Sequence, residues 1–327
     1  MKKSLLYGAL AFSPIAAFAQ SSSVTLYGIV DTGIVFESGG PKGWGVNMSS
    51  GVQDVSRWGI KGEEALGGGY SVIFKLEDGI LVNNGQTDTA NAAFSRVSYV
   101  GISSPYGTVT AGLDFTPIYL VLSPLTPFGN AFGGSPGQLM AGEKGGTRAP
   151  NQIIYHSPDF YGFKANVAYG FGNVAGSIGD SQQFGFSLSY KIGPATFEWG
   201  HQQVNNSTST DTSRNDLITG RYDFGFATAH VGFGISRGMG TTNSRDFLIG
   251  FSKRVAAVHE FYLAYQHKND LNQHQFNATG IIADYGYFIS KRTNLYVAAF
   301  WLSNHRFTTT KFGTGDRELD IGIRHLF

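Results

Sequence analysis

The last nine residues of the chain contain the pattern that decides the fold: Leu319-Asp320-Ile321-Gly322-Ile323-Arg324-His325-Leu326-Phe327. Large apolar side chains here alternate with Asp, Gly and Arg. Alternation with a period of two residues predicts a β-strand that has one apolar face. The alternating segment extends back to about residue 315, so it is longer than a typical strand of a soluble protein, which has about five or six residues. Its length matches a tilted strand that crosses a membrane.

The same alternation recurs along the chain, and we count sixteen such segments of about ten residues each. No stretch after the first twenty residues contains the roughly 18 consecutive apolar residues that a membrane-spanning helix needs. The predicted strands are residues 24–36, 53–63, 70–79, 93–103, 107–114, 148–157, 162–172, 182–191, 195–203, 214–224, 226–237, 244–254, 258–269, 276–288, 294–305 and 315–327.

The connections between these strands are alternately short and long. Short turns include residues 66–69, 104–106, 158–160, 192–194 and 290–293, and long loops are residues 37–52, 80–92, 115–147, 173–181, 204–213 and 270–275. Short turns at one end and long loops at the other are typical of an up-and-down outer-membrane barrel. Closure of such a barrel gives every backbone polar group a partner within lipid. The sequence therefore predicts an all-β fold, a single 16-stranded antiparallel transmembrane β-barrel over residues 20–327.

A secreted, soluble β-sandwich or propeller would also contain short alternating strands. Strand length, aromatic residues near strand ends and the alternating loop lengths favour the membrane barrel instead. Only 14% of residues are charged, against about 25% in ordinary globular chains, and 45 of the 327 residues are glycine. Cysteine is absent, which excludes disulfides, thiolate metal sites and a thiol nucleophile. The net charge of +1 gives no sign of a nucleic-acid partner.

The first nineteen residues, 1–19, are predicted to be a cleaved secretory signal peptide. Met1-Lys2-Lys3 is positively charged, Ser4–Phe18 is mostly apolar, and Ala17-Phe18-Ala19 matches the small-x-small cleavage motif. A single membrane anchor is the alternative, but Pro14 interrupts the apolar run, which is short for a span of about 20 residues. Cleavage would remove Lys2 and Lys3 and lower the net charge from +1 to −1.

Several segments resemble the trimeric general porins of Gram-negative outer membranes, in particular the beta-proteobacterial type. They occur in the family's order and extend over nearly the whole chain after residue 19. These segments are Ser23–Asp31, Ser56–Glu64, Leu66–Gly69, Phe74–Glu77, Ser95–Ile102, Tyr106–Thr110, Ser290–Thr293 and Arg324–Phe327. The ordered set is a far more specific signal than any one of its motifs.

The resemblance implies an outer-membrane channel for passive diffusion of small hydrophilic solutes and ions. It also implies a homotrimer surrounded by outer-membrane lipids, with the third long loop folded into the lumen as a constriction. Residues 115–147 are the counterpart of that loop, and their prolines and glycines suit a chain that turns inside a pore. The terminal Phe327 resembles the recognition signal for the barrel assembly machinery, and it also suits a last lipid-facing aromatic residue.

The predicted wall of the lumen is basic. Strand parity places Arg57 and Lys61 on one face, opposite Trp58 and Ile60. If the apolar pair faces lipid, both cations face the lumen, and this avoids the roughly 2–4 kcal/mol cost of an arginine in the middle of the bilayer.

The same reasoning directs Arg96 to the lumen if Val97 and Tyr99 face lipid. By resemblance, Arg57, Arg96 and Arg148 correspond to the basic cluster of the family's pore wall.

The loop expected opposite this wall has no charge or histidine from Phe115 to Gly142. The nearest acids are Asp114 and Glu143, and Lys144 follows directly, whereas the related porins usually have acidic residues in this loop. The family's usual basic residue just before the loop is Leu113 here. We therefore expect a constriction with a mild preference for anions. Alternatively, the arginines only pair with Glu63, Glu77 or Asp31 and contribute little selectivity.

Other groups of polar residues do not predict a chemical reaction. His267, Asp270 and His274 surround one loop, but a polar outer loop explains them better than a metal site does. Adjacent carboxylates such as Glu63 and Glu64 point to opposite faces of a strand, so they do not form an acid–base pair. No nucleophile elbow or phosphate-binding loop is present, so we expect no enzyme, cofactor or metal site.

A substrate-specific porin of the same fold, for a small anionic or sugar solute, is the second interpretation. The uncharged loop leaves room for it because it carries the aromatic residues Phe115, Tyr119, Phe128 and Phe132. Outer loops that act as an adhesin or receptor surface could coexist with either channel.

Overall fold

The computed structural model describes residues 22–40, 43–140, 146–239, 242–272, 277–304 and 316–327. The strands of this part of the chain are β1 (Ser22–Gly40), β2 (Gly43–Ser50), β3 (Arg57–Gly67), β4 (Tyr70–Leu81), β5 (Gln86–Thr87), β6 (Val97–Ser104), β7 (Gly107–Phe115), β8 (Arg148–His156), β9 (Phe163–Gly170), β10 (Gln183–Ile192), β11 (Ala195–Asn205), β12 (Thr212–Asp223), β13 (Thr228–Gly238), β14 (Thr242–Val255), β15 (His259–Asp270), β16 (Ala278–Phe288), β17 (Thr293–Asn304) and β18 (Arg317–Leu326). Its helices are α1 (Pro117–Leu122) and the 3₁₀ turns η1 (Ser123–Leu125) and η2 (Pro136–Gln138).

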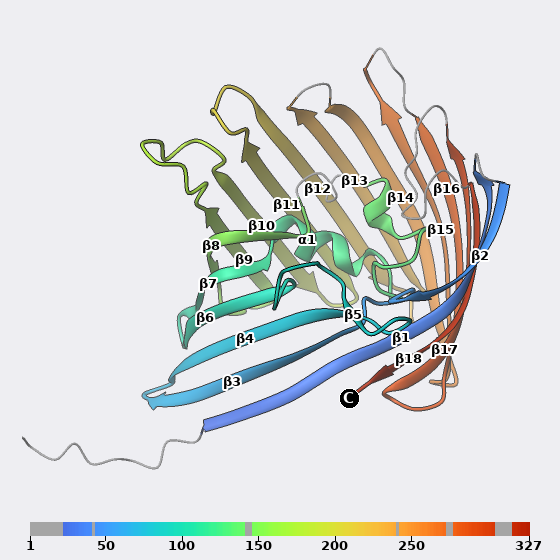
Figure 1. The fold of residues 1–327 in the computed structure, drawn as a ribbon, viewed down its shortest axis with the longest axis horizontal. Helices are drawn as coiled ribbons and strands as arrows, with labels where there is room; N and C mark the ends of the chain where they lie inside the picture. The colour runs from blue at the N-terminus through green and yellow to red at the C-terminus, as the bar shows by residue number, and fades with distance from the viewer. Residues whose placement is uncertain (1–21, 41–42, 141–145, 240–241, 273–276, 305–315) are drawn as a thin grey trace, which may run out of the picture.

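Sixteen of these strands form one closed antiparallel ring (Figure 1). Each strand of the ring pairs with the next one along the chain, and β1 closes it by pairing with both β3 and β18. The residues of β1 that pair with β3 are Ser22–Ile29, and those that pair with β18 are Ile29–Ser38. Closure leaves no open sheet edge in the ring, which is the condition for a sheet to cross lipid. The predicted 16-stranded antiparallel barrel is confirmed.

The two remaining strands lie within long loops. β2 pairs with residues Thr32–Gly40 of β1. On the same side of β1, the preceding residues Ser22–Ile29 pair with β3. Trp44, Val46 and Met48 alternate with small or polar residues in β2, so the period-two signal was present in the predicted loop 37–52. β5 adds only a two-residue pairing to the end of β4.

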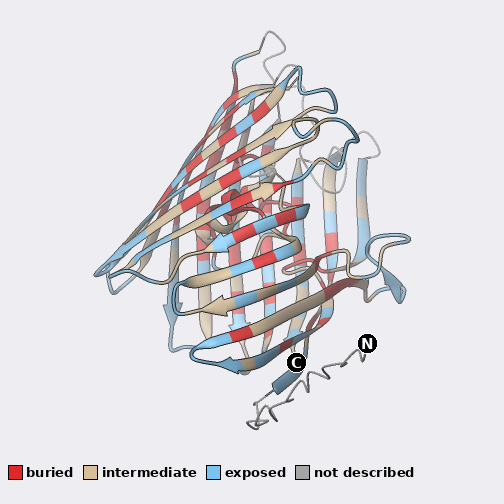
Figure 2. Ribbon diagram, turned by 90° about the vertical axis from the view of Figure 1, so that its left-hand side faces the viewer, coloured by how far each residue is buried: buried red, intermediate tan, exposed pale blue. Residues whose placement is uncertain are grey.

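The two faces of the barrel wall differ in polarity. Buried and exposed residues alternate along the strands, as the banding in Figure 2 shows. In β17 the exposed residues Leu295, Val297 and Trp301 alternate with the buried residues Tyr296, Ala298 and Phe300. Since the exposed residues are large and apolar, this outer face is suited to contact with lipid hydrocarbon.

The segment Phe115–Met140, which we call the inner loop, contains all the described helical turns. Thr116 starts α1 because its Oγ1 accepts a hydrogen bond from the Tyr119 backbone N–H at 3.4 Å, and Pro117 suits the first helical turn. In Figure 1, α1 lies within the ring of strands rather than outside it. Its neighbours are β9, β10, β11 and β12.

Apolar side chains hold the inner loop against the inner face of the barrel. Ile118, Leu122, Leu125 and Met140 belong to one buried cluster with Leu217 of β12 and Leu248 of β14. A second cluster joins Phe128, Phe132 and Leu139 to residues of β15, β16 and β17, including Tyr262, Ile282 and Tyr296.

Polar contacts from the same wall bind the backbone of the inner loop. Tyr262 donates to the Leu125 carbonyl at 2.9 Å, and Gln266 donates to the Gly134 carbonyl at 3.2 Å. The Gly133 N–H donates to Glu318 Oε1 at 3.1 Å. These bonds satisfy loop backbone groups that would otherwise be buried without partners. The inner loop is thus fixed to one side of the lumen, over β10 to β18.

Several sequence-based expectations fall outside the described residues: the signal peptide 1–19, Glu143 and Lys144 of the expected constriction loop, and His274. Among the helices that the structure does describe, none is long and apolar enough to cross a membrane.

Candidate functional site

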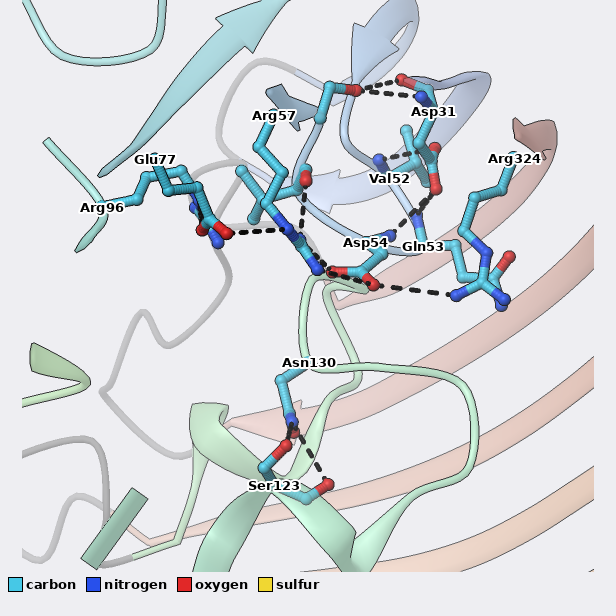
Figure 3. A network of polar contacts seen from close by, with 12 residues as sticks. Asp31, Val52, Gln53, Asp54, Arg57, Glu77, Arg96, Ser123, Asn130 and Arg324 are labelled. Atoms are coloured by element: carbon cyan, nitrogen blue, oxygen red, sulfur yellow. Dashed lines mark hydrogen bonds and ion pairs between the residues drawn. The ribbon is translucent and has the colours of Figure 1, made fainter. Parts of the chain in front are cut away.

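The inner wall opposite the inner loop carries a chain of alternating charges, drawn in Figure 3. Arg57, at the start of β3, donates from Nη1 to Asp54 Oδ1 at 2.8 Å and to the Val55 carbonyl at 2.9 Å. Its Nε lies 3.7 Å from Glu77 Oε2 in β4. Arg96 donates from Nε to Glu77 Oε1 at 3.0 Å. Glu77 therefore lies between two arginines and balances part of the charge of each.

Asp54 extends the chain of charges in the other direction. Its Oδ2 lies 3.7 Å from Arg324 Nη1 in β18, so one carboxylate bridges Arg57 and Arg324 across the seam where the barrel closes. Arg324 is held in turn because its Nε donates to Asn294 Oδ1 at 3.1 Å.

A buried carboxylate positions the segment 51–56 that carries Asp54. The two oxygens of Asp31 accept hydrogen bonds from the backbone N–H groups of Val52, Gln53 and Asp54 at 2.9–3.2 Å. The Tyr296 hydroxyl donates to the same carboxylate at 2.8 Å. Tyr296 has room because it lies over Gly322, where a Cβ would overlap its ring. Segment 51–56 is consequently turned into the barrel, and β3 begins at Arg57 instead of the expected residue 53.

Arg148 is placed differently from the other arginines. Its guanidinium carbon lies 4.5 Å from the centre of the Phe115 ring, and that ring stacks on Tyr119 with centroids 5.1 Å apart. Its Nε has no hydrogen-bond partner in the described part of the chain. Burial raises the pKa of the Tyr119 hydroxyl, and the negative charge of Asp54 acts in the same direction. The positive charges of Arg148 and Arg96 act to lower this pKa. The hydroxyl of Tyr119 on the inner loop thus lies within electrostatic reach of both the basic wall and Asp54.

The remaining expected site residues lie around this group. Lys61 is exposed, with its Nζ 5.6 Å from the centre of the Tyr27 ring, and it faces Lys75 across β3 and β4. Asp114 is the last residue but one of β7, and its Oδ1 accepts a hydrogen bond from the Phe115 N–H at 2.8 Å. The structure brings Arg57, Arg96 and Arg148 to one side of the barrel, and Lys61 lies nearer to the short turns on the same wall. Glu143 lies among the residues that the structure leaves undescribed.

The expected reason for the orientation of Arg96 was wrong. Val97 is fully buried and Tyr99 pairs directly with Lys75, so both face inward and not toward lipid. Arg96 precedes the first residue of β6, so strand parity does not govern its direction. Its side chain reaches Glu77 because the chain enters β6 through an irregular segment in which Phe94 has a φ of +54°.

Asp54, Arg324 and Lys75 also belong to this charged group, although they were not predicted from the sequence. Parity could have identified Arg324, because it shares a strand face with Asp320 and lies opposite Ile321 and Ile323. No local pattern marks Asp54, which was placed in a strand and owes its position to the distant Asp31. Of the three acids considered as partners of the arginines, Glu63, Glu77 and Asp31, the described ion pairs include Glu77, which pairs with Arg57 and Arg96.

The described residues contain no group of three or more His, Cys, Asp or Glu side chains that could hold a metal ion. The arrangement consists instead of fixed charges on a wall that faces a charge-free loop. Such an arrangement can attract or repel ions in water.

Comparison with known proteins agrees with this geometry. The family model described as "Gram-negative porin" matches residues 7–306. An outer membrane porin protein 32 of Delftia acidovorans is 31% identical to the chain, and an outer membrane porin of Bordetella pertussis is 26% identical. Each alignment covers 100% of both sequences.

Solved structures give the same result. An anion-selective porin from Comamonas acidovorans has a TM-score of 0.83 at 27% identity, and the match covers 94% of this chain and 100% of that one. OmpT of Vibrio cholerae, in its trimer form, has a TM-score of 0.72 at 15% identity, which shows a shared fold. The chain therefore belongs to the Gram-negative porin family, and it is an outer-membrane channel for the passive diffusion of small hydrophilic solutes.

Proposed function

We propose that this channel is a general diffusion pore with a mild preference for anions and that residues 115–147 form its constriction. The observation that carries the proposal is the charge difference across the lumen. The described inner loop has no charged residue, and the facing wall carries Arg57, Arg96, Arg148 and Arg324 against the nearby acids Glu77 and Asp54.

Neighbouring residues add charges of both signs to this wall. Lys61 and Lys75 add two cations nearer to the short turns, while Asp88 and Asp114 add two acids. A narrow lumen with walls of low dielectric constant focuses such a field, so anions are concentrated relative to cations. The solved relative described as anion-selective supports the same direction.

Reversal potentials in planar bilayers test the ion preference. In a tenfold KCl gradient, the reversal potential of the purified protein should have the sign that results when chloride permeates faster than potassium. A clear preference for potassium would contradict the proposal. Because surface charge is screened by salt, the preference should weaken as both solutions are raised toward 1 M.

A substrate-specific channel is the second candidate, and the stack of Arg148, Phe115 and Tyr119 favours it. A guanidinium beside aromatic rings suits a small solute that combines a carboxylate or phosphate with an apolar or sugar face. Saturable block of the ion current by one such solute would identify this candidate. Currents that fall only in proportion to solute size would favour general diffusion.

The proposed assembly is a homotrimer embedded in outer-membrane lipids. The exposed apolar residues Val24 and Leu26 of β1 and Val100 and Ile102 of β6 offer a surface for a second copy or for lipid. Chemical crosslinking in native outer membranes should give a trimer band. A chain that remains monomeric under crosslinking would contradict this part of the proposal.

The proposed maturation includes removal of residues 1–19 and recognition of Phe327 by the barrel assembly machinery. The backbone of Phe327 exchanges two hydrogen bonds of 3.1 Å with Gly28, so the last residue also completes the seam of the barrel. Mass spectrometry of the purified protein should find an N-terminus near Gln20. Replacing Phe327 by Ala should reduce the amount of heat-modifiable barrel in the membrane. We propose no catalytic activity.

A further inference from the structure

Three exposed arginines lie close together on the outer face of the barrel. They are Arg214 of β12, Arg237 of β13 and Arg245 of β14, three consecutive strands of the ring that are labelled in Figure 1. The serine that precedes each arginine is buried, so strand parity directs all three side chains outward. We call these three residues the outer arginine patch.

We propose that the outer arginine patch binds the headgroup of a phosphorylated lipid in the outer leaflet of the membrane. The proposed site lies on the lipid-facing surface of the barrel, so it does not depend on the ion preference of the pore.

The register of the strands brings the three positive charges together. Arg214 and Arg237 are direct partners across β12 and β13. Arg245 pairs with Ile235, which lies two residues before Arg237 on the same face, so Arg245 and Arg237 are diagonal neighbours. Like charges that face each other across an antiparallel pair destabilise it. An anion bound between these side chains would offset that repulsion.

The described carboxylates do not balance this charge. None of the three arginines forms an ion pair with an acid in the described part of the chain. Asp216 lies on the same face of β12 as Arg214, but its Oδ1 is 2.8 Å from His201 Nδ1 instead. The guanidinium groups are therefore available to an anion from outside the chain.

The patch lies at the edge of the apolar outer surface. Ile218, Phe233 and Phe247 are exposed and form one row of cross-strand partners on β12, β13 and β14. The arginines lie beyond this row, at the end of the barrel that has the longer loops, which is the extracellular end in outer-membrane barrels. Acyl chains can cover the apolar row while a headgroup phosphate accepts paired hydrogen bonds from the guanidinium groups.

The position of the patch in the ring favours lipid over a second copy of the chain. We have assigned subunit contact to the surface that includes β1 and β6. In the order of the ring, β7 to β11 separate β12–β14 from that surface on one side, and β15 to β18 separate them on the other. The patch thus faces away from the proposed trimer contact and toward the bilayer.

Native mass spectrometry of the purified protein in detergent, titrated with diphosphoryl lipid A, tests the proposal. The unmodified protein should bind this lipid, and Arg237→Gln should weaken binding by about fivefold. Replacing all three arginines by Gln should weaken binding by between about 10- and 100-fold. Since the substitutions remove repulsion between exposed side chains, the barrel should still fold, which heat-modifiable migration checks.

The matched control variant removes three exposed cations from the end of the barrel that has the short turns. It combines Lys253→Gln, Lys291→Gln and Arg292→Gln, and it should bind diphosphoryl lipid A as the unmodified protein does. Lipid A without its phosphates should bind more weakly to the unmodified protein and equally to the triple Gln variant of the patch. Inorganic pyrophosphate, which has the phosphates but no acyl chains, should bind far more weakly than diphosphoryl lipid A.

Four results would overturn the proposal. The first is unchanged lipid binding by the folded variant that lacks the three arginines, and the second is an equal loss of binding by the control variant. The third is pyrophosphate binding as tight as that of diphosphoryl lipid A, which would make the patch a site for a free anion. The fourth is loss of trimer crosslinking in the folded patch variant, which would assign these arginines to contact with a second copy.

Discussion

Arg148 and Arg96 carry the same charge, but their surroundings give them different roles. Arg96 is 8% exposed in its side chain and donates to Glu77, so much of its charge is balanced where it stands. Arg148 lies over the ring of Phe115, and no hydrogen bond from its Nε is found within the described part of the chain. A cation stacked on a ring keeps its charge available to a passing anion. At the scale of single residues, pairing decides which charges an ion in the lumen meets.

Replacing Arg148 by Gln should therefore lower the chloride-to-potassium permeability ratio by about two- to fivefold at 0.1 M salt. Arg148→Lys keeps the charge and should retain most of the ratio, although it loses the planar stacking on Phe115. Reversal potentials of the two variants, recorded side by side, check the prediction. Equal ratios in the Gln and Lys variants would show that the charge of Arg148 is not what matters.

At the scale of elements, two loops build the interior. The inner loop is held by apolar clusters and by hydrogen bonds from β15 and β18, and segment 51–56 is held by Asp31. Phe128 joins the two, because it is fully buried in the same cluster as Val52 and Tyr296.

Phe128→Ala should loosen the inner loop, because removing a buried Phe side chain costs about 3–5 kcal/mol. The barrel itself is held by strand pairing, so the variant should still fold, with a larger conductance and more open-channel noise. Phe226→Ala, at an exposed position in the short turn between β12 and β13, is the matched control. Single-channel currents as quiet as those of the control would count against the packing role.

Tyr296→Phe removes the hydroxyl that donates to Asp31. A hydrogen bond to a charged group contributes about 1.5–3 kcal/mol, so segment 51–56 should become less firmly held. We expect more current noise than in the unmodified channel, with the sign of the ion preference retained because no charge is lost. Tyr287→Phe, which removes an exposed outer hydroxyl, controls for loss of a tyrosine, and equal noise in both variants would contradict the assignment.

At the scale of the whole molecule, the closed ring separates two environments. Every strand of the ring pairs on both sides, which leaves its outer apolar face to lipid and its inner face to water and to the two loops. Val297, near the middle of β17, is one of the exposed outer residues.

Val297→Arg should destabilise the barrel in lipid by about 2–4 kcal/mol, the cost of an arginine near the bilayer midplane. Thr196→Arg, which places the same side chain on the inner face beside a cavity lined by Lys191 and Arg221, should cost much less. Urea titrations of folding into lipid vesicles give both values. If the two variants unfold at similar urea concentrations, the outer and inner faces of the barrel wall have been assigned incorrectly.

Most of the strands could be predicted from the sequence because a barrel strand has a local signature. Apolar and polar side chains alternate within about ten residues, and sixteen such segments were located to within a few residues. The errors occur where a contact from elsewhere in the chain overrides the local pattern. β3 begins four residues late because Asp31 binds the backbone of segment 51–56, and the orientation of Arg96 follows from Glu77 and not from parity.

The amino-acid sequence alone determined that the chain forms a closed transmembrane barrel, because the alternation of apolar and polar residues lies in short stretches. Its resemblance to a known family pointed to Arg57, Arg96 and Arg148. Only the tertiary structure decided which charges are balanced and which carboxylate faces the arginines. Asp31 and Tyr296 are far apart in the chain, and so are Asp54 and Arg324, and they meet only when β18 closes the ring on β1. Side-chain pairing across that seam depends on three-dimensional proximity, which no local periodicity encodes.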